Sequence, residues 1–244
     1  MSPIGSSDFN QQPTAAPTSN LGETPNRVLM GGGSNSQSGR WLWASGFESG
    51  LAEWGDRAFA TIDSTIAYQG AASALLTTQA LPSPNNMSWL RKSLMPYGAS
   101  FGFEMGFSIG LQFNPYEISF IIDGKNKTAG LKAHAEVIIT VTPGVSANLY
   151  YVNSSGTRVL IANIKTQFET TGYAAFRYIK IVFDPYENTL KRVYFNRSLY
   201  ELNVTGRFSG SADETTSFEI LLTSIAVDVV KMWVDNVIIT ADEP

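Results

Sequence analysis

The stretch Phe101-Gly-Phe-Glu-Met-Gly-Phe-Ser-Ile-Gly-Leu-Gln-Phe113 decides the fold of this chain. Its odd positions carry only large apolar side chains, and its even positions carry glycine or polar residues. Successive side chains of a β-strand point to opposite faces, so this period of two predicts one strand with its odd face in a core. At roughly 3.3 Å per residue, the strand would extend about 40 Å and cross a whole sheet.

Shorter apolar runs on both sides of this stretch predict further strands. We expect them at residues 41–44, 58–62, 74–78, 89–94, 117–122, 131–141, 147–151, 159–163, 173–183, 190–195, 217–225 and 229–240. Chain reversals are predicted where residues tolerate positive φ or fix φ, at Asp123-Gly124, Pro143-Gly144, Ser155-Gly156 and Asp184-Pro185. No helical stripe of apolar residues interrupts the pattern, so we expect one all-β domain over residues 41–244.

The composition argues against several classes of protein. The chain has 244 residues, with 17 Lys and Arg against 21 Asp and Glu, and a net charge of -4, which gives no field that would attract nucleic acid or an anionic membrane. It has no cysteine and a single histidine, so disulfides, thiolate sites and histidine-rich metal clusters are excluded. The start of the chain lacks a basic and apolar leader, and no apolar run reaches membrane-spanning length, so we expect synthesis in a cytosol and no membrane partner.

Residues 1–40 are rich in Ser, Gly, Asn, Gln, Pro and Thr. This composition has too few apolar groups to form a core, so we predict an extended N-terminal arm. Val28, Leu29 and Met30 form a compact apolar cluster just before three glycines. We therefore expect these three residues to anchor the arm on a protein partner.

Short motifs near the two ends of the β-rich body resemble a known fold. They are Gly46-Phe47-Glu48, Trp54 and Tyr68-Gln69-Gly70-Ala71-Ala72-Ser73 near the start, and Trp233-Val234-Asp235-Asn236-Val237 at the end. Over roughly residues 41 to 240 the chain resembles the jelly-roll sandwiches of carbohydrate-binding modules and of concanavalin A-like lectin or glucanase domains. This resemblance implies a jelly-roll β-sandwich whose first and last strands lie side by side.

The resemblance also implies a structural calcium ion. In similar jelly rolls, the residues that match Glu48 and Asp235 hold calcium together with backbone carbonyls, which here would come from residues 69–73. Calcium takes six to eight oxygen ligands, which two carboxylates, carbonyls and water can supply. The alternative is that both carboxylates accept hydrogen bonds that join the ends of the domain.

A catalytic constellation is not evident in the sequence. Glycoside hydrolysis uses two carboxylates, and laminarinase-like relatives carry Glu-x-Asp-x-x-Glu on one strand, a spacing that this chain lacks. His134 alternates with Lys132 and Glu136, away from the core face, where a Ser-His-Asp triad is one interpretation and a solvated polar face is the other. No Gly-x-Ser-x-Gly nucleophile turn occurs, because Ser209 in residues 206–210 is displaced. We therefore predict that the protein is not an enzyme.

One ligand or partner groove is predicted. Gly102, Gly106 and Gly110 would weaken a strand unless something lies close to its backbone, which is either a neighbouring side chain or a ligand or subunit in a groove. Trp89 and Tyr97 flank an irregular proline-rich segment and offer aromatic surface to the same groove.

Three functional hypotheses follow. The arm, the sandwich and the absence of a catalytic motif resemble decoration or cement proteins of bacteriophage heads, which implies a structural protein on the virion surface with capsid proteins as partners. The alternative is a carbohydrate-binding module, an extracellular protein with a glycan partner, and the third is a glycoside hydrolase. A homo-oligomer is compatible with each.

Overall fold

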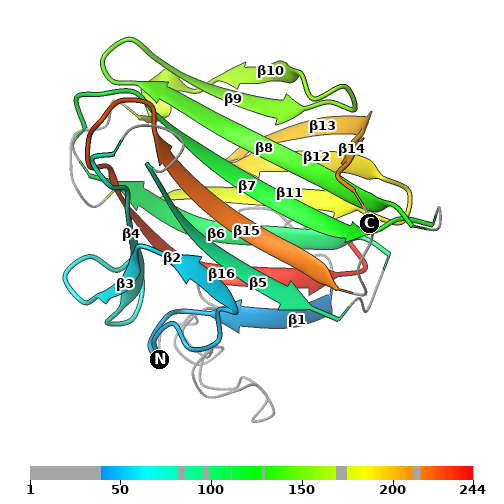
Figure 1. Cartoon of the computed structure of the whole chain (residues 1–244), viewed down its shortest axis with the longest axis horizontal. Helices are drawn as coiled ribbons and strands as arrows, with labels where there is room; N and C mark the ends of the chain where they lie inside the picture. Colours follow the sequence, from blue (N-terminus) through cyan, green and yellow to red (C-terminus); the bar gives the residue numbers. More distant parts are fainter. Residues whose placement is uncertain are drawn as a thin grey trace, which may run out of the picture.

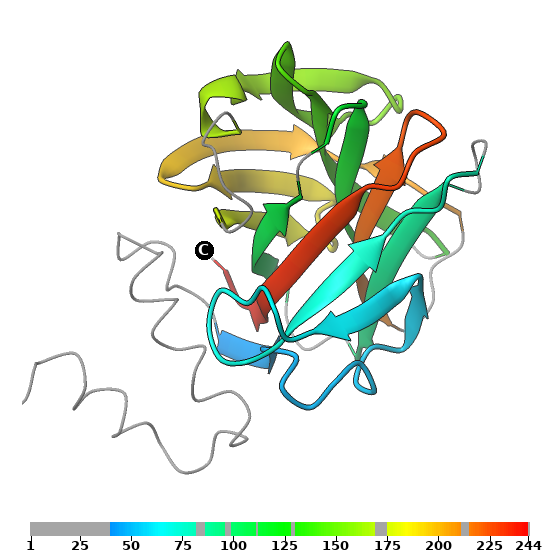
Figure 2. The same cartoon turned by 90° about the vertical axis from the view of Figure 1, so that its left-hand side faces the viewer.

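The computed structural model describes residues 40–243, except 82–85, 96–98, 111, 128–129, 169–174 and 211–214. Its strands form two antiparallel eight-stranded sheets, sheet A and sheet B, which pack face to face (Figures 1 and 2). The predicted all-β jelly-roll sandwich is confirmed. Within the described residues, no helix is long and apolar enough to cross a membrane.

Sheet A has the strand order β13-β12-β11-β6-β16-β4-β3, and β1 pairs with β16 beside this path. Its strands are β1 (Arg40–Ser45), β3 (Ala60–Asp63), β4 (Ser73–Thr77), β6 (Phe101–Ile109), β11 (Arg177–Asp184), β12 (Thr189–Phe195), β13 (Ser198–Thr205) and β16 (Lys231–Ala241).

Sheet B has the order β10-β9-β8-β7-β15-β5-β2, and β14 pairs with β8. Its strands are β2 (Asp56–Ala58), β5 (Met87–Leu94), β7 (Tyr116–Lys125), β8 (Lys132–Thr142), β9 (Ser146–Val152), β10 (Arg158–Asn163), β14 (Arg207–Phe208) and β15 (Thr216–Ser224). One turn of 3-10 helix, η3 (Lys165–Gln167), follows β10.

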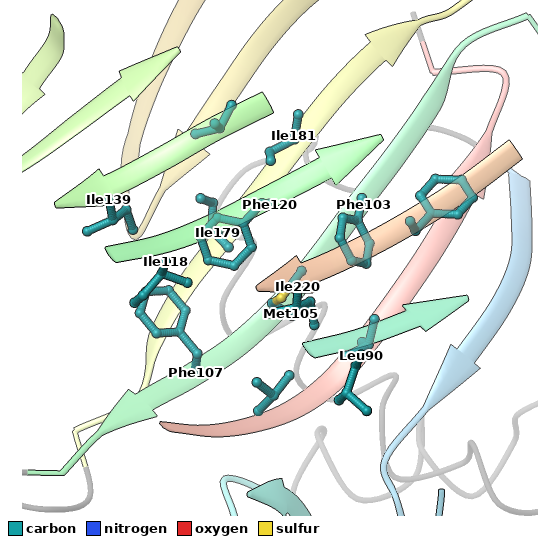
Figure 3. Packing of buried hydrophobic residues seen from close by; sticks show 14 of the residues in the cluster. Leu90, Phe103, Met105, Phe107, Ile118, Phe120, Ile139, Ile179, Ile181 and Ile220 are labelled. Carbon is teal, nitrogen blue, oxygen red and sulfur yellow. The ribbon is translucent and has the colours of Figure 1, made fainter. Parts of the chain in front are cut away.

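The core lies between the sheets, and β6 supplies its centre (Figure 3). The odd positions of β6 are buried as the period of two predicts, and Phe103 and Met105 have no exposed surface. From sheet B, Phe218 lies with its ring centroid 5.5 Å from that of Phe103, and Phe120 lies 5.7 Å from Phe107. Full burial of each such side chain stabilises the fold by about 1.5 to 3 kcal/mol.

The first and last strands lie side by side, as the resemblance implied. β1 pairs antiparallel with β16, so that Arg40 lies opposite Ala241 and Ser45 opposite Val237. This pairing brings the two ends of the domain together in sheet A.

Three local predictions need correction. The long strand ends at Ile109 rather than Phe113, and Phe113 is almost fully exposed in the loop that follows. Asp123 and Gly124 lie inside β7, and the reversal comes later, where Gly130 has a φ of 81°. Strand β13 was not predicted, although Tyr200, Leu202 and Val204 alternate with polar residues there.

Candidate functional site

The outer face of sheet B carries a group of charged side chains around the single histidine. Pairing across β7, β8 and β14 sets Asp123 and Arg207 on the two sides of His134. The alternation of β8 adds Lys132 and Glu136 to the same face. We call Asp123, Lys132, His134, Glu136 and Arg207 the histidine cluster.

His134 is held between two carboxylates. Its Nδ1 lies 2.6 Å from Oδ1 of Asp123, and its Nε2 lies 3.6 Å from Oε2 of Glu136, an ion-pair distance that is too long for a hydrogen bond. Arg207 Nη2 lies 3.9 Å from the same Glu136 oxygen, and Lys132 Nζ lies 3.7 Å from Oδ2 of Asp123. His134 is only 5% exposed, so these interactions act with little screening by water.

The pKa shifts of the cluster agree with one another. Burial alone would lower the pKa of His134, but its interactions with Asp123 and Glu136 outweigh burial and raise it above 6.5. Burial would raise the pKa values of Asp123 and Glu136, yet their interactions with His134 lower both. The arrangement therefore favours an imidazolium between two carboxylates.

A Ser-His-Asp triad is not formed at this histidine. Asp123 occupies the position of the orienting acid, but among the described residues no side chain hydrogen-bonds to Nε2 of His134. The geometry instead suits charge pairing and proton transfer by His134 and its two carboxylates.

A second charged group extends the site across sheet B. Arg91 on β5 hydrogen-bonds through Nε to Oε2 of Glu219 at 2.8 Å, and its Nη1 lies 3.6 Å from Oδ2 of Asp56. Register connects this group with the histidine cluster, because Glu219 pairs with Ile121, which in turn pairs with Glu136. Charged side chains therefore reach from β2 to β14 on one face.

A less polar row of side chains runs beside the charged groups. Successive pairing across five strands connects, in order, Trp89, Leu221, Ser119, Ile138 and Tyr150. We call these five residues the aromatic row, because Trp89 and Tyr150 stand at its two ends and both remain partly exposed. A surface that combines aromatic rings with charged hydrogen-bonding groups suits an amphipathic ligand such as a sugar chain.

The predicted groove over the glycines is not formed. A Cβ on Gly102 would lie 2.7 Å from Oε1 of Glu243, and one on Gly110 would lie 3.3 Å from the Trp233 ring, so side chains of the same chain cover this strand. Trp89 lies on sheet B, whereas the glycine strand β6 belongs to sheet A, so these residues do not share a groove. Tyr97 lies outside the described residues, as do Val28, Leu29 and Met30.

The outer face of sheet A instead holds a sealed charged group. Lys180 Nζ lies 2.8 Å from Oε1 of Glu243 and 3.5 Å from Oε2 of Glu104, and Tyr178 donates a 2.7 Å hydrogen bond to Glu104. We call these four residues the lysine cluster. Lys180 is 0% and Glu243 2% exposed, so the cluster fastens the C-terminal segment to β6 and β11 rather than presenting a surface.

Glu48 and Asp235 meet at the loop of residues 68–72, but backbone amides rather than carbonyls face them. Asp235 Oδ2 accepts hydrogen bonds from the amides of Tyr68 and Gln69 at 2.8 and 3.0 Å, and Glu48 Oε1 accepts one from Ala71 at 2.7 Å. Gly70 has a φ of 74°, and a Cβ there would collide with the Glu48 carboxylate. Only a glycine at position 70 therefore allows this loop to lie so close to the Glu48 carboxylate.

This donor set does not fit calcium. Calcium requires an oxygen-rich shell, whereas amide N–H groups direct their positive ends at these carboxylates. Burial raises the pKa of Asp235 to about 6 despite three backbone hydrogen bonds. No group of three or more His, Cys, Asp or Glu among the described residues could hold a metal ion. The geometry agrees with the alternative interpretation, in which both carboxylates accept hydrogen bonds that join the ends of the domain. Calcium binding stays an untested prediction.

The sequence identified part of the site. It placed His134, Lys132 and Glu136 on one face, but it assigned Asp123 to a turn and did not single out Arg91 or Arg207. Period-two alternation from Glu117 to Asp123 would have placed Asp123 on the outer face. Arg91 and Arg207 reach the site only through strand pairing between distant segments.

Two solved structures similar to this chain are carbohydrate-active enzymes. The carbohydrate esterase vb_24B_21 from Shiga toxin-encoding bacteriophage phi24B has a TM-score of 0.57 at 14% identity, and the match covers 84% of this chain and 99% of that one. An endo-β-1,4-glucuronan lyase from the fungus Trichoderma reesei has a TM-score of 0.50 at 14% identity, with 78% and 92% covered. No protein-family model and no curated protein matches the sequence.

These similarities establish the concanavalin A-like fold and correct one prediction. At 14% identity they show the shared fold and not a shared reaction. The prediction that this protein is not an enzyme is nevertheless overturned, because both structures are enzymes and each is matched over nearly its whole length. The absence of a laminarinase motif excluded one arrangement of catalytic residues, not catalysis on this fold.

Proposed function

We propose that this protein binds a polysaccharide across the outer face of sheet B and processes it there, as a component of a bacteriophage particle. The observation that carries the proposal is the combination, on one face, of the histidine cluster and the aromatic row. The carbohydrate-active proteins that share the fold agree with a glycan as the partner.

The aromatic row supplies the binding surface. The rings of Trp89 and Tyr150 pack against the C–H faces of sugar rings, and the four intervening strand spacings separate them by about 19 Å. A glycan that contacts both rings must span several sugar units. This spacing favours a polymer over a monosaccharide as the substrate.

The histidine cluster supplies the chemistry. Asp123 fixes the orientation of His134 through Nδ1, which leaves Nε2 as the nitrogen that can exchange a proton. Nε2 is buried in the structure, so Glu136 or Arg207 must move aside when a substrate binds. The raised pKa favours the protonated ring, and His134 acts as a general acid toward the leaving oxygen while water adds to the atom from which this oxygen departs. Glu136 lies beside the same nitrogen, Arg207 lies beside Glu136, and both orient the bond that is broken.

The test measures binding and turnover with a panel of bacterial surface polysaccharides. Wild-type protein is expected to retain at least one of them in affinity electrophoresis and to shorten it or remove its acyl groups. Trp89→Ala is expected to weaken binding, whereas His134→Gln is expected to abolish turnover and leave binding largely intact. Phe113→Ala, a matched change of an exposed aromatic residue away from the site, is the control.

Two outcomes would contradict the proposal. If wild-type protein neither binds nor alters any polysaccharide, the outer face of sheet B has another use. If it binds but His134→Gln behaves as wild type in every turnover assay, the protein is a carbohydrate-binding module and the catalytic assignment fails.

The proposal that the protein belongs to a bacteriophage particle depends on the N-terminal arm. The likeness to a bacteriophage protein and the polar composition of residues 1–40 support a protein that attaches to the virion surface through this arm, as a decoration or cement protein does. Deleting residues 1–33 removes Val28, Leu29 and Met30 and leaves the described strands intact. The deletion is expected to abolish co-sedimentation with capsids from the same source. Equal co-sedimentation of both forms would reject attachment through the arm.

A further inference from the structure

A cavity of about 290 Å³ opens at the end of the sandwich where β7 ends and β8 begins, the right-hand end in Figure 1. It lies between four parts of the chain. The end of β7 and the connection after it contribute Lys125, Asn126 and Lys127, the β11–β12 turn contributes Pro185 and Tyr186, and the starts of β6 and β15 contribute Phe101 and Thr216. None of these residues belongs to the histidine cluster or the aromatic row.

The walls of the cavity are fixed by hydrogen bonds between the two sheets. Asn126 is buried, and its Nδ2 donates to the carbonyls of Pro185 and Tyr186 at 3.1 and 2.8 Å. Gly124 permits this close approach, because a Cβ there would lie 2.7 Å from Cβ of Pro185. The turn that carries Tyr186 is therefore held against the β7–β8 connection.

A buried hydroxyl group in the cavity wall favours a ligand that itself carries hydroxyl groups. Thr216 is 1% exposed and lines the cavity, yet its Oγ1 has no hydrogen-bond partner among the residues that the structure describes. A buried hydroxyl without a partner costs about 1 to 3 kcal/mol, so a bound hydroxyl group that pairs with it is stabilised. The hydroxyl group of Thr216 therefore makes one end of the cavity polar.

The remaining lining combines an aromatic surface with positive charge. Tyr186 is 52% exposed, and Lys127 Nζ lies 5.8 Å from its ring centroid. Lys127 also pairs with Glu187 at 2.7 Å, but an ammonium group has three donors, and both partners are half exposed. Lys125 lines the cavity as a second cation.

We propose that this cavity binds a single anionic sugar unit, such as a uronate, as a site separate from the outer face of sheet B. The sugar ring packs on Tyr186, one hydroxyl pairs with Thr216 Oγ1, and the negative group lies near Lys125 and Lys127. The volume is at the lower limit of small-molecule sites, which restricts the occupant to one sugar ring.

The test is a titration of the full chain with glucuronate, followed by NMR or calorimetry, with glucose and glucose 6-sulfate as comparison ligands. Glucuronate is expected to bind and glucose to bind at least about tenfold more weakly, a difference of about 1.4 kcal/mol. Binding of both anionic sugars would mean that charge is recognised in general, and binding of glucuronate alone would mean that the carboxylate is recognised.

Variants separate this site from the proposed polysaccharide site. Tyr186→Ala and Thr216→Val are each expected to weaken glucuronate binding about tenfold or more, whereas His134→Gln and Phe113→Ala leave it unchanged. Melting curves verify that each variant is folded. The proposal is overturned if the wild type does not bind glucuronate at millimolar concentrations, if glucose binds equally well, or if both cavity variants bind as the wild type does.

Discussion

The two outer faces of the sandwich both carry buried or half-buried charges, but in different surroundings. On sheet A, Lys180 and its two carboxylate partners have almost no exposed surface. On sheet B, the histidine cluster remains partly open, because the Arg207 side chain is 38% exposed beside Glu136. Similar residue types therefore form the fully buried lysine cluster on one face and the partly exposed histidine cluster on the other.

The difference shows what decides whether a charged cluster is structural or functional. A charge that loses all contact with water must be fully paired within the protein, and it then has nothing left to offer a ligand. A cluster at a partly open face keeps directions from which a ligand can approach. Burial of the whole group, rather than its composition, separates the two.

The largest loss of stability is expected from a substitution in the lysine cluster. Lys180→Met removes the cation that lies against both buried carboxylates, Glu104 and Glu243, although Arg192 Nη2 still lies 3.7 Å from Oε2 of Glu243. This change is expected to reduce the free energy of unfolding by about 3 to 5 kcal/mol. Urea denaturation measures this loss. Lys127→Met, which removes a lysine from an exposed ion pair, is the control and is expected to leave stability nearly unchanged. Equal effects of the two variants would remove the distinction between the faces.

A smaller loss of stability is expected on the open face. His134→Gln removes the ring between Asp123 and Glu136, but Lys132 and Arg207 still compensate the two carboxylates. The expected cost is about 1 to 2 kcal/mol, together with the loss of polysaccharide turnover. A loss as large as that of Lys180→Met would make the histidine cluster a structural element.

The pH dependence of stability sharpens the same comparison. The pKa of His134 is raised in the folded state, so its stabilising contribution is fully present below pH 6.5 and is lost as the pH rises through the raised value. The difference in unfolding free energy between wild type and His134→Gln should therefore shrink as the pH rises above 6.5. A difference that does not change with pH would contradict the imidazolium assignment.

The smallest effect is expected at the junction of Glu48 and Asp235. Backbone amides already compensate these carboxylates, so a chelator is expected to leave the melting temperature unchanged. Thermal melts with EDTA and with added calcium measure this directly. A reversible fall in the melting temperature with EDTA would instead establish the calcium site that the resemblance implies.

Much of the fold could be predicted because alternation is a local property. The apolar positions from Phe101 to Ile109 all face the core, and β1 pairs with β16 as the terminal motifs implied. The end of β6 and the position of the β7–β8 turn could not be predicted from turn residues alone, since Asp123 and Gly124 are held in a strand by pairing with β8. Tertiary pairing overrides weak local preferences of this kind.

The sequence by itself determined the all-β class, the core face of each long strand and the common face of Lys132, His134 and Glu136, because these depend only on the spacing of neighbouring residues. Only the tertiary structure decided that Asp123 and Arg207 complete the histidine cluster, that Glu243 seals the lysine cluster, and that Tyr186 and Thr216 share a cavity. Asp123 lies only 11 residues before His134, on the neighbouring strand, but the other residues come from segments far apart in the chain. Their meeting depends on strand order and register, which no local pattern encodes.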